Sequence, residues 1–72
     1  MTLKEALKLK YEVTLTPDGG FWVASIKELP GCITQGNTQI KAIERLKEAK
    51  EIWIKEMYKR DVKIELPKDY IE

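Results

Sequence analysis

The sequence contains no histidine and a single cysteine, Cys32. The absence of histidine removes the most common general base of enzymes. One cysteine without histidine supplies too few nitrogen and sulfur ligands for a structural zinc site, and it has no partner for an internal disulfide. We therefore expect no metal, no cofactor and no catalytic residue, and we expect Cys32 to be a small buried hydrophobic residue.

The sequence also lacks an excess of either charge and a long apolar run. It has 13 basic and 12 acidic residues, a net charge of +1, whereas binding to a phosphate backbone depends on a strong basic excess. No apolar run approaches the roughly 20 residues of a membrane span, and the first residues do not form a signal peptide. We expect a cytoplasmic protein that does not interact with membranes.

The carboxylates do not form a catalytic pattern either. The four acidic residues between positions 44 and 56 alternate with lysine and arginine, which is typical of the solvated face of a helix. A two-metal nuclease site needs several acids that converge at strand ends, and the first predicted hairpin contains only Glu12 and Asp18. We predict that the protein is not an enzyme.

The hydrophobic periodicity predicts the order α-β-β-β-α-β. Thr2 and Glu5 have the form of a capping box, which predicts a short helix over residues 3–9. Alternating residues 11–16, a turn with two glycines, and residues 21–26 predict a hairpin. A corner at residues 29–31 leads to a third strand over residues 32–35. Thr38 is a good N-cap for a helix to about residue 59, and residues 62–66 alternate as a fourth strand.

These elements predict one α+β domain of two layers over residues 1–72, with one long helix packed on the sheet. The sheet and the long helix occupy residues 11–66, and residues 67–72 form a loose tail. The helix has an apolar stripe of Ala42, Ile43, Leu46, Ala49, Trp53 and Met57, and we expect Ile40, Ile52 and Ile54, which lie off its middle, to widen it. Because so small a domain buries little core, self-association is one way for it to gain stability.

The second strand is apolar on both faces, which indicates that both faces are covered. Phe21 and Val23 lie on one face, and Trp22, Ala24 and Ile26 on the other. The long helix can cover only one of them. Either the short N-terminal helix covers the other, or that face is an interface with a partner or a second copy. For this interface we predict Phe21 and Val23 as apolar anchors, with Glu12 and Asp18 as acids that meet a basic surface.

Residues 11–66 resemble the HicB-type antitoxin family of toxin–antitoxin pairs. The resemblance rests on five groups of residues in a fixed order: Tyr11-Glu12-Val13, Asp18-Gly19-Gly20-Phe21-Trp22-Val23-Ala24, Leu29-Pro30-Gly31-Cys32, Gly36-Asn37-Thr38, and Ala42, Leu46, Ala49 and Trp53. The chain departs mildly from the family pattern, with Asn37 in place of an aspartate and Lys27-Glu28 where a proline is usual.

The resemblance implies a partial RNase H-like sheet without nuclease acids, and a protein that binds and masks a small HicA-type mRNA-cleaving toxin. It also implies a homo-oligomer, a dimer or a tetramer. Many relatives carry a further DNA-binding domain, and we expect none in these 72 residues. The alternative is a stand-alone homo-oligomeric binding module without a toxin partner.

Overall fold

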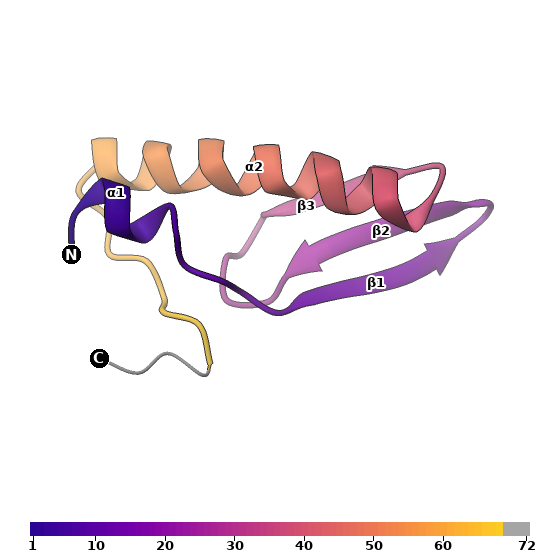
Figure 1. Cartoon of the computed structure of the whole chain (residues 1–72), viewed down its shortest axis with the longest axis horizontal. Helices are drawn as coiled ribbons and strands as arrows, with labels where there is room; N and C mark the ends of the chain where they lie inside the picture. The colour runs from indigo at the N-terminus through magenta and orange to yellow at the C-terminus, as the bar shows by residue number, and fades with distance from the viewer. Residues whose placement is uncertain (69–72) are drawn as a thin grey trace.

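The computed structural model describes residues 1–68 and has the element order α1, β1, β2, β3, α2 (Figure 1). The elements are α1 (Leu3–Ala6), β1 (Val13–Asp18), β2 (Phe21–Ile26), β3 (Ile33–Gly36) and α2 (Gln39–Lys59). The strands form an antiparallel sheet in the order β1-β2-β3. The predicted α+β class with one long helix on a sheet is confirmed.

The hairpin forms where the glycine pair predicts it. Gly19 and Gly20 have φ angles of 54° and 92°, the positive values that a two-residue type I′ turn needs. Asp18 then pairs with Phe21, and the register continues to Val13 opposite Ile26. The first strand is displaced by two residues from its predicted position, because the turn begins after Asp18 and not at Pro17.

The helix α2 covers one face of β2 and β3. Its start is capped by Thr38, whose Oγ1 accepts a hydrogen bond from the Lys41 N–H at 3.1 Å, as predicted. Gly36 permits the close approach of this helix to β3, since a Cβ at Gly36 would lie 2.6 Å from the Ala42 nitrogen. The apolar cluster between the two layers contains Ala24, Ile26, Leu29, Cys32, Ala42 and Leu46.

Beyond the end of the sheet, α1 lies beside the last turns of α2 (Figure 1). A second apolar cluster packs at this place. Its buried residues are Ala6, Leu9, Ile54 and Ile64. Trp53 packs against both clusters, and its Nε1 donates a hydrogen bond to the Pro30 carbonyl at 3.1 Å. Tyr11 also packs against both clusters, so Trp53 and Tyr11 together connect them.

Two predicted elements differ in the structure. The capping box of Thr2 and Glu5 is present, but α1 ends at Ala6, and residues 7–9 continue in tight turns that direct Leu9 into the second cluster. Ile54 is fully buried, although its sequence position placed it away from the middle of the apolar stripe. Ile40 and Ile52 were expected to widen that stripe, and they are 70% and 69% exposed.

The predicted fourth strand over residues 62–66 is wrong. A helix of 21 residues is roughly 30 Å long, whereas a strand of six residues spans about 20 Å, so α2 carries the chain past the end of the sheet. Asp61 then ends the helix with a φ of 56°. Of the three apolar residues in this alternation only Ile64 packs in the second cluster, while Val62 and Leu66 stay exposed, so the alternation corresponds neither to strand pairing nor to one buried face.

Candidate binding surface on the sheet

The sheet has one face against α2 and one face without a helix. Successive side chains of a strand point to opposite faces, and Ala24 and Ile26 are buried under α2. Phe21, Val23 and Ser25 therefore point to the other side. The cross-strand register then assigns eight strand residues to this side, which we call the open face: Thr14, Thr16, Asp18, Phe21, Val23, Ser25, Ile33 and Gln35.

The open face has an apolar centre and polar edges. Phe21 and Ile33 are 45% and 59% exposed, and Val23 is half-buried between them on the middle strand. Threonines from β1 lie on one side and Gln35 from β3 on the other. An apolar centre with a polar rim is the usual anatomy of a protein interface.

No helix or strand within residues 1–68 covers the open face, and residues 65–68 border it only at the Thr14 end, across a hollow. The short helix α1 packs against the last turns of α2, and Tyr58 of α2 holds the residues before α1 through hydrogen bonds to the carbonyls of Met1 and Thr2. In Figure 1, α1 lies to the side of the sheet and close to α2. The alternative in which the N-terminal helix covers the second apolar face is therefore wrong for the described residues.

The structure brings together three of the four residues predicted for an interface. Asp18 pairs directly with Phe21 across the hairpin, and Val23 follows on the same face of β2. Glu12 precedes β1 at its opposite end, six residues from Asp18, which corresponds to about 20 Å of extended chain. The two acids therefore lie at opposite ends of β1 and do not form a pair.

Sequence reasoning missed Ile33, the most exposed apolar residue of the open face. The third strand was predicted, but neither face was assigned to it. A signal was available, because Cys32 was expected to be buried and its neighbour in a strand must then point to the opposite face. Cys32 is 3% exposed, and Ile33 is 59% exposed.

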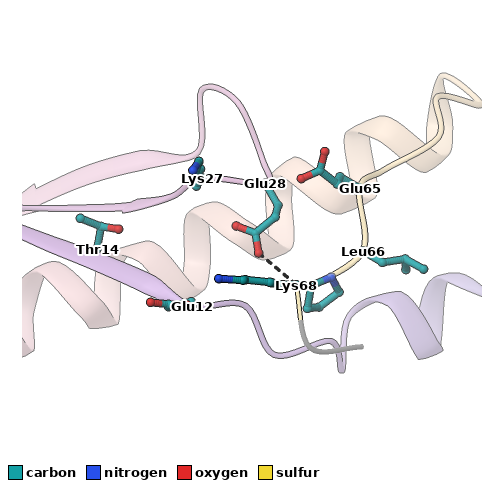
Figure 2. A pocket seen from close by; sticks show the side chains of 8 residues that line it. Glu12, Thr14, Lys27, Glu28, Glu65, Leu66 and Lys68 are labelled. Atoms are coloured by element: carbon teal, nitrogen blue, oxygen red, sulfur yellow. Dashed lines mark hydrogen bonds between the residues drawn. The ribbon is translucent and has the colours of Figure 1, made fainter. Parts of the chain in front are cut away.

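A hollow of about 550 Å³ lies at the Glu12 end of the open face (Figure 2). It is lined by Glu12, Thr14, Lys27, Glu28, Glu65, Leu66, Pro67 and Lys68. The backbone N–H of Lys68 donates to Glu28 Oε2 at 3.3 Å, which links the last described residues to the corner between β2 and β3. Within residues 1–68 no three acids, cysteines or histidines are grouped as a metal site would require. The lining of the hollow combines the acids Glu12, Glu28 and Glu65 with the lysines Lys27 and Lys68.

Tyr11 holds the chain that borders this hollow. Its hydroxyl donates a hydrogen bond to the Glu65 carbonyl at 2.6 Å. Burial is the largest cause that raises the pKa of Tyr11 to about 12, and the negative charges of Glu28 and Glu65 raise it further. The phenol therefore stays protonated and remains a donor at neutral pH.

Cys32 is buried in the cluster between sheet and helix, as the sequence predicted. Burial raises the pKa of its thiol, and the nearby Lys50 opposes this shift in part. Because the thiolate is the nucleophilic form of cysteine, a buried thiol with a raised pKa is poorly suited to covalent chemistry.

Comparison with known proteins gives a relative of almost the same length. A protein named UPF0150 from Thermoplasma acidophilum is 40% identical over 65 residues, which cover 89% of this chain and 91% of the relative. No family model matches the chain, and no solved structure matches it. Among the described residues, no helix has the length and apolarity that crossing a membrane would require.

Proposed function

The chain belongs to the UPF0150 family, and we propose on that premise that it is a HicB-like antitoxin, which binds and masks a small HicA-type mRNA-cleaving toxin. The name of the relative states no activity. The proposal of a toxin partner therefore rests on the order of motifs between residues 11 and 66, which resembles that of HicB-type antitoxins. The three-stranded sheet with a helix on one face is compatible with the partial RNase H-like fold that this resemblance implies.

The observation that carries the proposal is the open face. Phe21, Val23 and Ile33 form an apolar centre that no described segment covers. Large aromatic side chains in an interface contribute much of the binding energy when a partner removes them from water. Phe21 therefore anchors the partner in this proposal, and Ile33 extends the apolar contact across β2 to β3.

The acids give the open face its preference for a basic partner. Asp18 lies beside Phe21 at the hairpin end, and Glu12 lies at the other end of β1. Opposite charges across an interface speed association and fix orientation more than they add affinity. A toxin that cleaves mRNA presents a basic surface to the RNA, and it acts in the cytoplasm, where the proposal also places this protein. The chain itself contributes no reaction and no cofactor.

The second candidate is a homo-oligomeric binding module without a toxin. The same exposed apolar centre supports it, since a second copy could cover the open face of the first and bury Phe21 and Ile33 in both. The two candidates differ in what covers the open face when the protein is alone. Light scattering on the wild type and on the Phe21→Asp/Ile33→Asp variant tests this. Both candidates are expected to be homo-oligomers, but only the module must lose its dimer or tetramer when the open face is changed.

Co-expression with the protein encoded by the neighbouring small reading frame tests the toxin proposal. Wild-type protein should co-purify with that product and relieve its inhibition of growth. The double variant Phe21→Asp/Ile33→Asp should lose both effects while its thermal melt stays close to that of the wild type. Ile52→Asp is the matched control, because Ile52 is 69% exposed on α2, and it should retain both. Co-purification by the double variant, or no basic product in that frame, would refute the antitoxin role.

A further inference from the structure

The outer edge of β1 is open to another strand. In the order β1-β2-β3, β1 pairs only with β2, and no backbone group of β1 bonds to another part of residues 1–68. An unpaired edge presents a row of N–H and C=O groups that can pair with a further chain. The outer edge of β1 can therefore bind another chain through its backbone groups, separately from the side chains of the open face.

The hairpin turn determines which backbone groups of β1 face outward. The residues that flank a two-residue turn form a hydrogen-bonded pair, and such pairs alternate along the strands with pairs that do not bond each other. Asp18 and Phe21 flank the turn, so Leu15 and Val13 direct their N–H and C=O groups to the free edge. In agreement, the Ile26 N–H donates to the Cys32 carbonyl and turns away from its partner Val13.

The opposite edge of the sheet is protected. The strand β3 has four residues, and Arg45 Nη1 of α2 donates to the outward-facing carbonyl of Gln35 at 3.0 Å. Short length and coverage by another element are two of the ways in which proteins block an edge strand. On β1 only Pro17 protects the edge in a comparable way. It removes one outward N–H group but leaves the outward N–H and C=O groups of Val13 and Leu15 unpaired within residues 1–68.

A groove of about 160 Å³ runs beside this free edge, between β1 and α2. The helix packs on β2 and β3, so the helix-facing side of β1 is only partly covered and Val13 remains 37% exposed. The groove is lined by Tyr11, Val13, Ile26, Ile43 and Leu46 and is rimmed by Lys10, Lys47 and Lys50. A cavity of about 150 Å³ holds a benzene-sized group, so this groove fits one large apolar side chain.

We propose that the β1 edge binds an extended acidic segment of a partner protein, which adds a fourth strand beside Val13 and Leu15. One large apolar side chain of that segment enters the groove. Side chains two residues before and after it share its face of the strand, and acids at those positions meet the lysine rim. Neither of the two ion pairs within residues 1–68 involves Lys10, Lys47 or Lys50. Lys50 Nζ donates to the Leu9 carbonyl at 3.0 Å, so Lys10 and Lys47 are the charges that meet the acids of the segment.

Charge distinguishes this occupant from a second copy. If β1 paired with β1 of another copy, the two grooves would meet and the lysine rims would face each other, which is unfavourable. The edge site is independent of the open face, and its failure would leave the proposed function intact.

An NMR titration with the capped peptide Thr-Glu-Thr-Leu-Thr-Glu-Thr tests the proposal on the full chain. The peptide should shift the amides of Val13 and Leu15 and slow their hydrogen exchange, with smaller changes at Phe21 and Val23. A peptide with lysine in place of glutamate should not bind. A peptide N-methylated on the strand-pairing side should lose binding because it cannot complete the ladder.

Matched charge reversals on the protein complete the test. The double variant Lys10→Glu/Lys47→Glu should weaken peptide binding by about tenfold, whereas Lys41→Glu, outside the groove, should have little effect. The proposal is overturned if the glutamate peptide does not bind, or if its shifts map to the open face. It is also overturned if the N-methylated peptide binds equally well, or if a single-stranded oligonucleotide produces the same shifts at Val13 and Leu15.

Discussion

Replacing Trp53 with alanine should remove a large part of the stability of this domain. Trp53 packs against both apolar clusters, and its indole N–H donates to the Pro30 carbonyl at 3.1 Å. Truncation of a buried tryptophan to alanine lowers the free energy of unfolding by about 3–5 kcal/mol. A hydrogen bond such as the one to Pro30 contributes roughly 1 kcal/mol to the free energy of unfolding. Because Trp53 is half-buried, we expect Trp53→Ala to lower the free energy of unfolding by about 3 kcal/mol.

That loss is large for a chain of 72 residues, whose free energy of unfolding by the usual per-residue values is roughly 4–11 kcal/mol. Urea denaturation followed by circular dichroism measures the effect. Trp53→Phe keeps most of the packing and loses the hydrogen bond, so it should cost about 1 kcal/mol. Ile52→Ala, at an exposed neighbouring position, should cost less than about 0.5 kcal/mol. Equal costs for Trp53→Ala and Ile52→Ala would refute the assignment of Trp53 as a link between the clusters.

Three further changes test other parts of the fold in the same denaturation assay. Gly36→Ala should destabilise by about 1–3 kcal/mol, since its Cβ would lie 2.6 Å from the backbone of α2; an unchanged midpoint would contradict that close approach. Thr38→Ala should cost about 1 kcal/mol through loss of the N-cap, whereas Thr38→Ser should cost little. Tyr11 has its pKa raised to about 12 in the folded state. Its contribution to the free energy of unfolding is therefore complete below pH 10 and is lost as the pH rises through 12. The stability difference between wild type and Tyr11→Phe should shrink over that range, and a constant difference would contradict the buried phenol.

The order of the first five elements could be predicted because local signals agreed with the apolar pattern. The pair Gly19-Gly20 demands positive φ at two successive residues, and Thr38 begins a long amphipathic helix. Each signal acts within a few residues, so no tertiary information was needed. The two-faced character of β2 likewise predicted that Phe21 and Val23 would share a face away from Ala24.

The errors arose where tertiary packing overrides periodicity. Residues 62–66 alternate as a strand would, but the length of α2 places them beyond the sheet, where Ile64 packs against α1. Ile54 is buried because α1 approaches α2 from a side that the sheet does not cover. The second cluster can be recognised only from the position of α1 in the fold. Neither the periodicity of the helix nor the spacing of its apolar residues predicts it.

The candidate site was predictable only in part. Asp18, Phe21 and Val23 follow from the hairpin register, whereas the position of Glu12 depends on the length of β1. The open β1 edge could not be foreseen, since the predicted fourth strand was a possible partner for it. That edge became apparent only when residues 62–66 proved to lie elsewhere.

The central claim is that the open face is the surface on which a partner protein binds. NMR cross-saturation from an unlabelled toxin-sized partner to the labelled chain tests it most directly, because the signal reports which residues touch the partner. The account predicts the strongest saturation at Phe21, Val23 and Ile33 and little at Ile40 and Ile52, which lie on α2 and are more exposed than those three. Saturation confined to α2, with the open face unaffected in the complex, would contradict it.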